Sequence, residues 1–243
     1  MEVIGIGITG IALLLATFMG HQYLPNRATA IARDWLPALL MPMMYWQAGL
    51  LATTINKNFQ RKLEATDEKL LGTWLAKLTR KSAYRGIAAT LETAYLSCYI
   101  LVPTGLAVLY LSNLRRHATD YWSVILPATY ACYAFTAFVP TLPPRSIAND
   151  AVRPVRSTIR TLNLWFVHRV TTELNTFPSA HVTSTLGGSL LVFHLVPRVG
   201  WALVLISIGI ALGAVLGRYH YAVDVILGAI LAVGVFAVYV SFS

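Results

Sequence analysis

The chain has 243 residues, of which 56% are hydrophobic and only 12% are charged. A soluble domain carries about twice that charged fraction, so the composition excludes an ordinary water-soluble enzyme and predicts an integral membrane protein. The net charge is +9. Because the basic residues lie in loops between apolar segments, the expected partners are membrane lipids and phosphate-bearing substrates, and nucleic acid is not expected.

Seven apolar segments approach or reach the roughly 17–25 residues that a transmembrane helix needs. They are 3–20, 36–53, 88–110, 122–140, 181–196, 200–217 and 224–241. The fifth is the shortest, so six or seven crossings are expected. The sequence therefore predicts an all-α fold: one integral-membrane domain over 1–243, built as a polytopic bundle of membrane helices.

The first segment begins with Met1 and Glu2, has no basic region before it and is followed by no obvious small-residue cleavage site. We therefore expect a retained span rather than a secretory signal. Seven crossings would place 54–87, 141–180 and 217–223 on one side. Fourteen of the nineteen lysines and arginines lie there, which favours a cytoplasmic face. A phosphate site would itself enrich arginine on this side, so the orientation stays open.

The basic loop 54–87 has apolar residues at helical spacing with lysines and arginines between them. Two interpretations fit this pattern equally well. One is a helix lying in the membrane interface, and the other is a solvated helix that connects two spans.

His220 and Asp224 stand four residues apart, which on a helix places both side chains on one face. A carboxylate that binds one imidazole nitrogen leaves the other nitrogen as a nucleophile. A structural His–Asp pair at a span end is the alternative. A metal site is the weaker alternative, because no further acidic or cysteine ligand stands nearby.

The segment Phe177–His181 precedes a predicted span. Pro178 fixes the chain before the helix, and Ser179 is positioned to cap it, with the amides of the first turn able to face an anion. His181 then lies in the first turn, where it could give a proton to a leaving oxygen. An ordinary capped helix with a polar histidine at the interface is the alternative.

Two arginines complete the polar set. Arg145 ends the proline-rich tract 140–145, which fixes where its guanidinium points, and Arg218 stands two residues before His220. Arginine suits bidentate phosphate binding. Each could instead bind lipid headgroups at the interface.

Three elements together resemble the type 2 phosphatidic acid phosphatase superfamily, most closely its inositolphosphotransferase-like branch. They are the proline-rich tract that ends in Arg145, the element FPSAH at Phe177–His181 and the element RYHYAVDVILG at Arg218–Gly228. The resemblance covers about 120–240, which would be the catalytic half, with weaker echoes at 58–72. It implies a six-helix core.

The resemblance also implies a role for each site residue. His220 would attack phosphorus and form a phosphohistidine, Asp224 would orient it, and His181 would protonate the leaving alkoxide. The groups that hold the phosphate oxygens would be Ser179, the backbone amide of Ala180, Arg145 and Arg218. No metal and no organic cofactor is implied.

The sequence departs from the family pattern in two places. Ser146 stands where the first motif has a lysine seven residues before Arg153-Pro154, so Arg145 would have to substitute for that motif. Ala214 stands where the third motif has an arginine. Arg218 is one helical turn further along, close enough for a long side chain to reach back.

The expected function is that of a multi-pass cell-membrane lipid phosphatase acting on a phospholipid or polyprenyl phosphate or diphosphate. The alternatives are a phosphotransferase that passes a phospho-headgroup to an alcohol such as inositol, and a small anion channel or transporter. The resemblance usually implies a catalytic face toward the periplasm or a lumen, opposite to the face that the basic residues favour.

Overall fold

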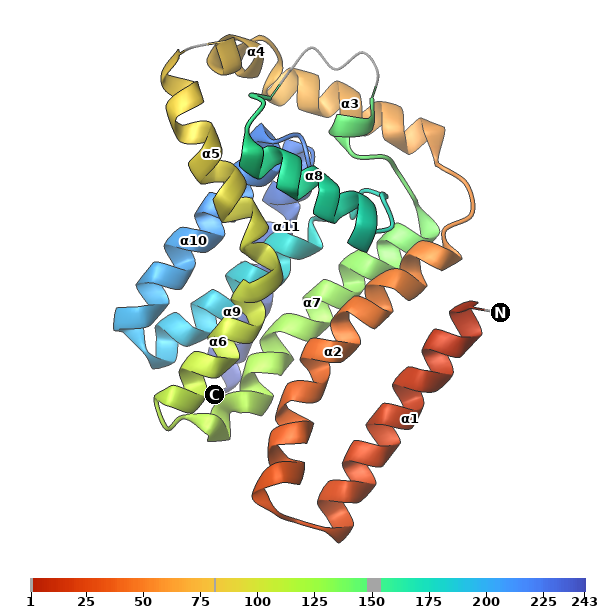
Figure 1. Cartoon of the computed structure of the whole chain (residues 1–243), viewed down its shortest axis with the longest axis vertical. Coiled ribbons are helices and arrows are strands. Elements are labelled where there is room, and N and C mark those ends of the chain that lie inside the picture. The colour runs from red at the N-terminus through yellow and green to blue at the C-terminus, as the bar shows by residue number, and fades with distance from the viewer. Residues whose placement is uncertain (1, 81, 148–153) are drawn as a thin grey trace.

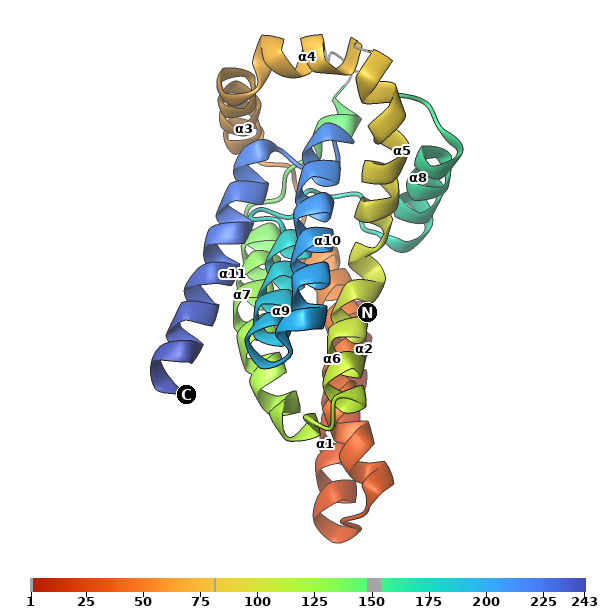
Figure 2. The same ribbon diagram turned by 90° about the vertical axis from the view of Figure 1, so that its left-hand side faces the viewer.

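The computed structural model describes residues 2–80, 82–147 and 154–243, which form eleven α-helices and no β-strand. The helices are α1 (Glu2–Tyr23), α2 (Arg27–Leu51), α3 (Lys57–Leu70), α4 (Gly72–Arg80), α5 (Ser82–Leu96), α6 (Cys98–Leu111), α7 (Ala118–Phe138), α8 (Thr158–Val170), α9 (Ala180–Leu195), α10 (Pro197–Leu216) and α11 (Ala222–Phe242). The long helices run side by side as a bundle, and α3 and α4 lie across one end of it (Figures 1 and 2). This confirms the predicted all-α bundle.

Each predicted apolar segment coincides with a helix or with a pair of helices. Within the described residues, α1, α10 and α11 are each long and apolar enough to cross a membrane, and the pair α5 and α6 would make a fourth span if its 59° bend lies within one crossing. The other three helices that coincide with predicted spans, α2, α7 and α9, are not both long and apolar enough to be counted as spans. Helix α9 has only 16 residues. Several spans thus fit a membrane protein, and six or seven crossings stay a prediction.

Helix α9 is the centre of the bundle, because it packs against α6, α7, α10 and α11. Most of its residues are buried, and many of them are small. A Cβ added to Gly188 would lie 2.7 Å from the hydroxyl of Tyr121, so the absence of a side chain allows α7 to approach closely. The first turn of α9, with His181, is therefore held inside the molecule.

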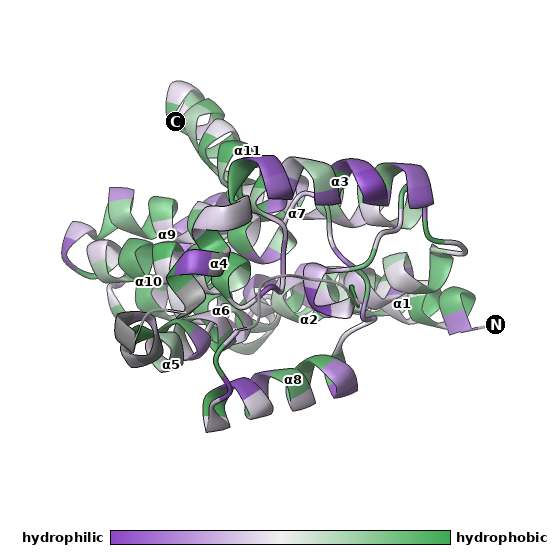
Figure 3. Cartoon of the chain, turned by 90° about the horizontal axis from the view of Figure 1, so that it is seen from above, coloured by the Kyte–Doolittle hydropathy of each residue, from purple (hydrophilic) through white to green (hydrophobic). Residues whose placement is uncertain are grey.

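The basic segment forms α3 and α4, which confirms that it is helical. Gln60, Leu63 and Asp67 form the buried face of α3, whereas the basic residues Lys57, Arg61 and Lys62 are exposed. Seen from above, α3 carries its hydrophilic residues across the end of the bundle (Figure 3). Its buried face meets the first turn of α11.

Candidate active site

His220 lies in the short turn between α10 and α11. Its Nδ1 is 3.4 Å from Oδ2 of Asp224. Asp224 is fully buried, and the same oxygen accepts a 2.9 Å hydrogen bond from the backbone N–H of Tyr221. A carboxylate at Nδ1 favours the tautomer that carries its proton there, which leaves the Nε2 lone pair for an electrophile.

The four-residue spacing predicts that His220 and Asp224 lie on one helix, but in the structure they do not. Tyr221 is the N-cap of α11, so His220 precedes the helix and Asp224 is its third residue. The carboxylate caps the helix and faces His220 at the same time. The predicted proximity of the pair is therefore present, but the chain turn at 217–221 creates it rather than helical periodicity.

His220 is nearly fully buried and lies outside the membrane-spanning helices. Burial lowers the pKa of its imidazole to about 3, and the nearby positive charge of Arg145 lowers this pKa further in the same direction. The imidazole is therefore neutral at pH 7, which is the form that a nucleophile requires.

His181 lies opposite, in the first turn of α9. The ring centroids of His181 and His220 are 5.9 Å apart and their planes are inclined by 75°. The two rings line one small cavity of about 20 Å³, together with Arg145, Tyr95 and Tyr219. That volume is about the space one water molecule needs.

Arg145 is hydrogen-bonded to the turn that carries His220. Its backbone N–H donates to the carbonyl oxygen of Arg218 over 3.0 Å, and its Nη1 donates to the carbonyl oxygen of Tyr219 over 3.3 Å. The guanidinium lines the cavity between the histidines. It is thus placed to bind phosphate oxygens. Arg153, which belongs to the altered first motif, lies outside the described residues.

Arg218 is not where a phosphate ligand is expected. Its Nη1 lies 2.6 Å from Oδ2 of Asp67 on α3, and both side chains are buried. Arg218 is absent from the residues that line the cavity between the histidines. Its role as a phosphate ligand stays a prediction, whereas its ion pair with Asp67 gives it a structural role.

Ser179 is the N-cap of α9, as predicted, and its hydroxyl accepts a 3.5 Å hydrogen bond from the N–H of Val182. The backbone N–H of Ala180 faces the hydroxyl of Thr176 at 3.4 Å. Neither Ser179 nor Ala180 lines the cavity between the histidines. The structure therefore brings together His181, His220, Asp224 and Arg145 and leaves the phosphate-binding roles of Ser179 and Ala180 as predictions.

A buried polar network behind the site was missed from the sequence. The ring of Tyr219 stacks on Tyr95 with 3.9 Å between centroids, and its hydroxyl donates to Glu92 over 2.7 Å. Arg160 and Asn163, both on α8, also donate to the Glu92 carboxylate, over 2.7 and 2.6 Å. A carboxylate inside an apolar segment is costly, so Glu92 was the available signal.

Within the described residues, no group of three or more histidine, cysteine, aspartate or glutamate side chains is arranged to hold a metal ion. The two buried cysteines, Cys98 and Cys132, are both free thiols.

Two facing histidines, one backed by a carboxylate and both beside an arginine, at the end of a bundle of apolar helices, are the features of a membrane enzyme that acts on phosphate esters. A family model described as the PAP2 superfamily matches residues 61–238. The chain belongs to this superfamily, the type 2 phosphatidic acid phosphatases, and a phosphatase-type function follows from the membership. The match does not single out the inositolphosphotransferase-like branch. Searches of curated proteins and of solved structures found no match.

Proposed function

We propose that the protein is an integral-membrane lipid phosphatase that hydrolyses a lipid phosphate or diphosphate through a phosphohistidine at His220. One observation carries the proposal: His181 lines two neighbouring spaces that share part of their lining. One is the polar cavity that it shares with His220, and the other is an apolar pocket between helices of the bundle. A ligand with a phosphate head and a hydrocarbon tail fits this arrangement.

The chemistry needs two steps. The Nε2 lone pair of His220 attacks phosphorus while the bond from phosphorus to the ester oxygen breaks. His181, which the negative charge of the bound phosphate favours in its protonated form, gives its proton to the departing oxygen. Water then attacks phosphorus and passes a proton to His181, and the P–N bond breaks. Inorganic phosphate leaves, and both imidazoles return to their starting states.

Arg145 supplies the positive charge that the phosphoryl group requires. Because the transferred group carries negative charge on its oxygens throughout, a fixed guanidinium in a buried site is the main source of electrostatic stabilisation in this proposal. Two hydrogen bonds hold Arg145 to the His220 turn, so the charge and the nucleophile keep a constant separation.

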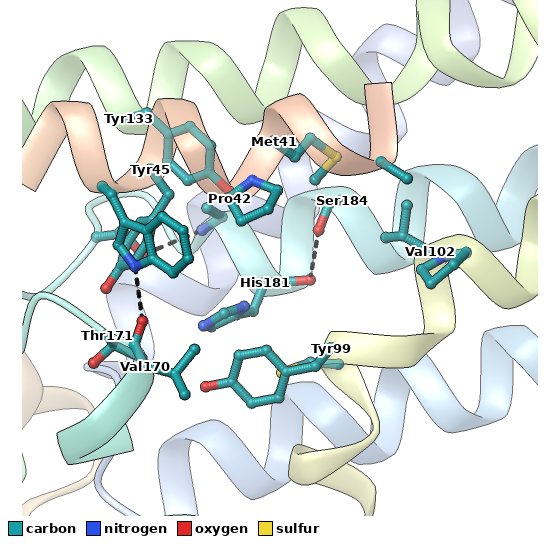
Figure 4. A pocket seen from close by; sticks show the side chains of 16 residues that line it. Met41, Pro42, Tyr45, Tyr99, Val102, Tyr133, Val170, Thr171, His181 and Ser184 are labelled. Atoms are coloured by element: carbon teal, nitrogen blue, oxygen red, sulfur yellow. Dashed lines mark hydrogen bonds between the residues drawn. The ribbon is translucent and has the colours of Figure 1, made fainter. Parts of the chain in front are cut away.

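The apolar pocket supports a lipid substrate. It has a volume of about 190 Å³ and lies between α2, α6, α7 and α9. Figure 4 shows the ring of His181 projecting from α9 toward Tyr99 and Val170, with Val102 further along the pocket. The pocket shares Tyr45, Thr171, Thr176 and His181 with the cavity between the histidines. A single hydrocarbon chain in the pocket would present its phosphate to His220.

A substrate screen tests the proposal. Purified protein is given phosphatidic acid, polyprenyl phosphates, lysolipids and phosphatidylinositol in detergent micelles, with His220→Ala protein as the blank. Release of inorganic phosphate that the blank lacks supports hydrolysis. Transfer to an added alcohol in place of phosphate release would identify a phosphotransferase, and equal signals from both proteins would refute the proposal.

A further inference from the structure

Helix α3 crosses the end of the bundle (Figures 1 and 2). There it contacts two segments of the site: the loop that leads to Arg145 and the turn that carries His220. Its buried face consists of Gln60, Leu63 and Asp67. Gln60 and Asp67 are seven residues apart, which is about two helical turns, so they project from the same face. Each makes polar contacts with a segment more than 80 residues away in the sequence.

Gln60 joins the loop of Arg145 to the turn of His220. Its Oε1 accepts a 2.7 Å hydrogen bond from the backbone N–H of Leu142, three residues before Arg145. Its Nε2 donates over 2.6 Å to the hydroxyl of Tyr221, the residue after His220. One side-chain amide therefore fixes the distance between the two loops.

Asp67 holds the His220 turn from both of its ends. Oδ2 accepts a 2.6 Å hydrogen bond from Nη1 of Arg218, and Oδ1 accepts a 2.8 Å hydrogen bond from the backbone N–H of Ala222. Ala222 is the first residue of α11, so its N–H has no partner within the helix. Arg218 and Ala222 are each two residues from His220, on opposite sides of it.

The turn needs such support because its backbone is strained. Arg218 has a φ of 61°, the left-handed region that a residue with a Cβ seldom occupies. The buried ion pair with Asp67 helps to hold Arg218 in this conformation, and the conformation in turn sets where His220 leaves the turn. A carboxylate near the N-terminus of α11 is also electrostatically favourable.

We propose that Asp67 is a positioning residue for His220 and that α3 acts as a strap, with Gln60 as its second attachment. The inference rests on the proposed function in assigning His220 as the nucleophile. Asp67 touches neither the cavity nor His220; it acts through Arg218 and Ala222. In this proposal Arg218 contributes to the reaction mainly through its ion pair with Asp67, which fixes the backbone of the turn that carries His220.

The test uses the full chain in detergent and compares wild type with Asp67→Asn, Gln60→Ala and the control Glu68→Gln. Glu68 is an exposed carboxylate on the same helix. Two quantities are measured: kcat and KM with a phosphate ester that wild type hydrolyses, and backbone amide hydrogen exchange in the peptide 217–224. The second measurement does not depend on turnover.

Asp67→Asn should lower kcat by about 10- to 100-fold, because a small displacement of a nucleophile has an effect of that size. KM should stay within about twofold, since the cavity and the pocket are unchanged. Exchange in 217–224 should accelerate. Gln60→Ala should shift both quantities in the same direction by a smaller amount, and Glu68→Gln should change neither.

A wild-type kcat in Asp67→Asn, or a change confined to KM, would overturn the positioning role. If Asp67→Asn protein does not fold, Gln60→Ala decides the question: wild-type kcat and wild-type exchange in that variant would overturn the strap. If wild type itself turns over no phosphate ester, the proposed function fails. Exchange then still tests the strap, which falls if exchange in 217–224 is the same in all four proteins.

Discussion

His181 and His220 face each other with ring centroids 5.9 Å apart, although 39 positions of sequence separate them. One ring stands on the first turn of α9 and the other on the turn between α10 and α11. A phosphoryl group between them would have a nucleophile on one side and a proton donor for the leaving oxygen on the other, which matches the nearly in-line geometry of phosphoryl transfer.

Replacing His181 by asparagine should slow the phosphorylation of His220 far more for esters with poor leaving groups than for esters with good ones. Without a proton donor, an alkyl phosphate must expel an alkoxide, and its phosphorylation rate should fall by about 10²- to 10⁴-fold. A nitrophenyl phosphate needs no proton at its leaving oxygen, so the rate of its first nitrophenol burst should fall far less, although the later hydrolysis of the phosphohistidine is slowed with both substrates. Equal losses of the phosphorylation rate with both substrates would contradict the assignment of His181 as the acid.

Adding a methyl group at Gly228 should push α11 away from α9. A Cβ there would lie 2.7 Å from the carbonyl oxygen of Ser179 and 3.0 Å from Oγ1 of Thr183. Gly228→Ala should therefore destabilise the fold by about 1–3 kcal/mol and lower kcat, because it separates His181 from His220.

Gly234→Ala is the matched control on the same helix, since nothing lies within 4 Å of its added Cβ. Thermal unfolding in detergent that does not differ between the two variants would refute this packing argument.

Filling the apolar pocket should select against long chains. Ala38 on α2 lines the pocket and is only partly buried, so Ala38→Phe should fit without unfolding the bundle. We expect kcat/KM to fall by about tenfold or more for a long-chain lipid phosphate and to change little for a short soluble ester. Ala65→Phe, at an exposed position on α3, is the control. A loss of the same size with both substrates would show that the pocket does not hold the chain.

Acidification should destabilise the protein through His220. The folded-state pKa is about 3, whereas an unfolded histidine has a pKa of about 6.5. Between these values the unfolded chain binds a proton that the folded chain does not. Stability therefore falls as the pH is lowered from about 6.5 toward 3, by up to about 1.4 kcal/mol per pH unit for this one group.

Melting temperatures measured between pH 7 and pH 4.5 check this effect. His220→Gln protein lacks the titrating group and should show a shallower decline than wild type. Parallel declines in the two proteins would mean that His220 does not contribute to acid sensitivity.

Much of the fold could be predicted from the sequence because long apolar runs specify membrane helices directly. The pairing of His220 with Asp224 was predictable too, because both residues belong to one short motif. The bend between α5 and α6 was not, since both halves are apolar and nothing around Ser97 breaks the hydrophobic run.

The strap could not have been predicted either. Gln60 and Asp67 lie in a segment whose basic residues dominate its pattern, and their contacts with Tyr221 and Ala222 span 161 and 155 positions. Only the three-dimensional path of the chain brings them over the site. For the same reason Arg218 was expected at the phosphate, although it pairs with Asp67.

The central claim is that His220 becomes phosphorylated during turnover. Protein mixed with a lipid substrate labelled in its phosphate is quenched within one turnover, digested and analysed by mass spectrometry. We predict that the label is attached to His220 in wild type and accumulates in His181→Asn protein when the leaving group is activated, and that His220→Ala protein carries none. Release of phosphate at the wild-type rate from His220→Ala protein, or a covalent label on any other residue, would contradict the account.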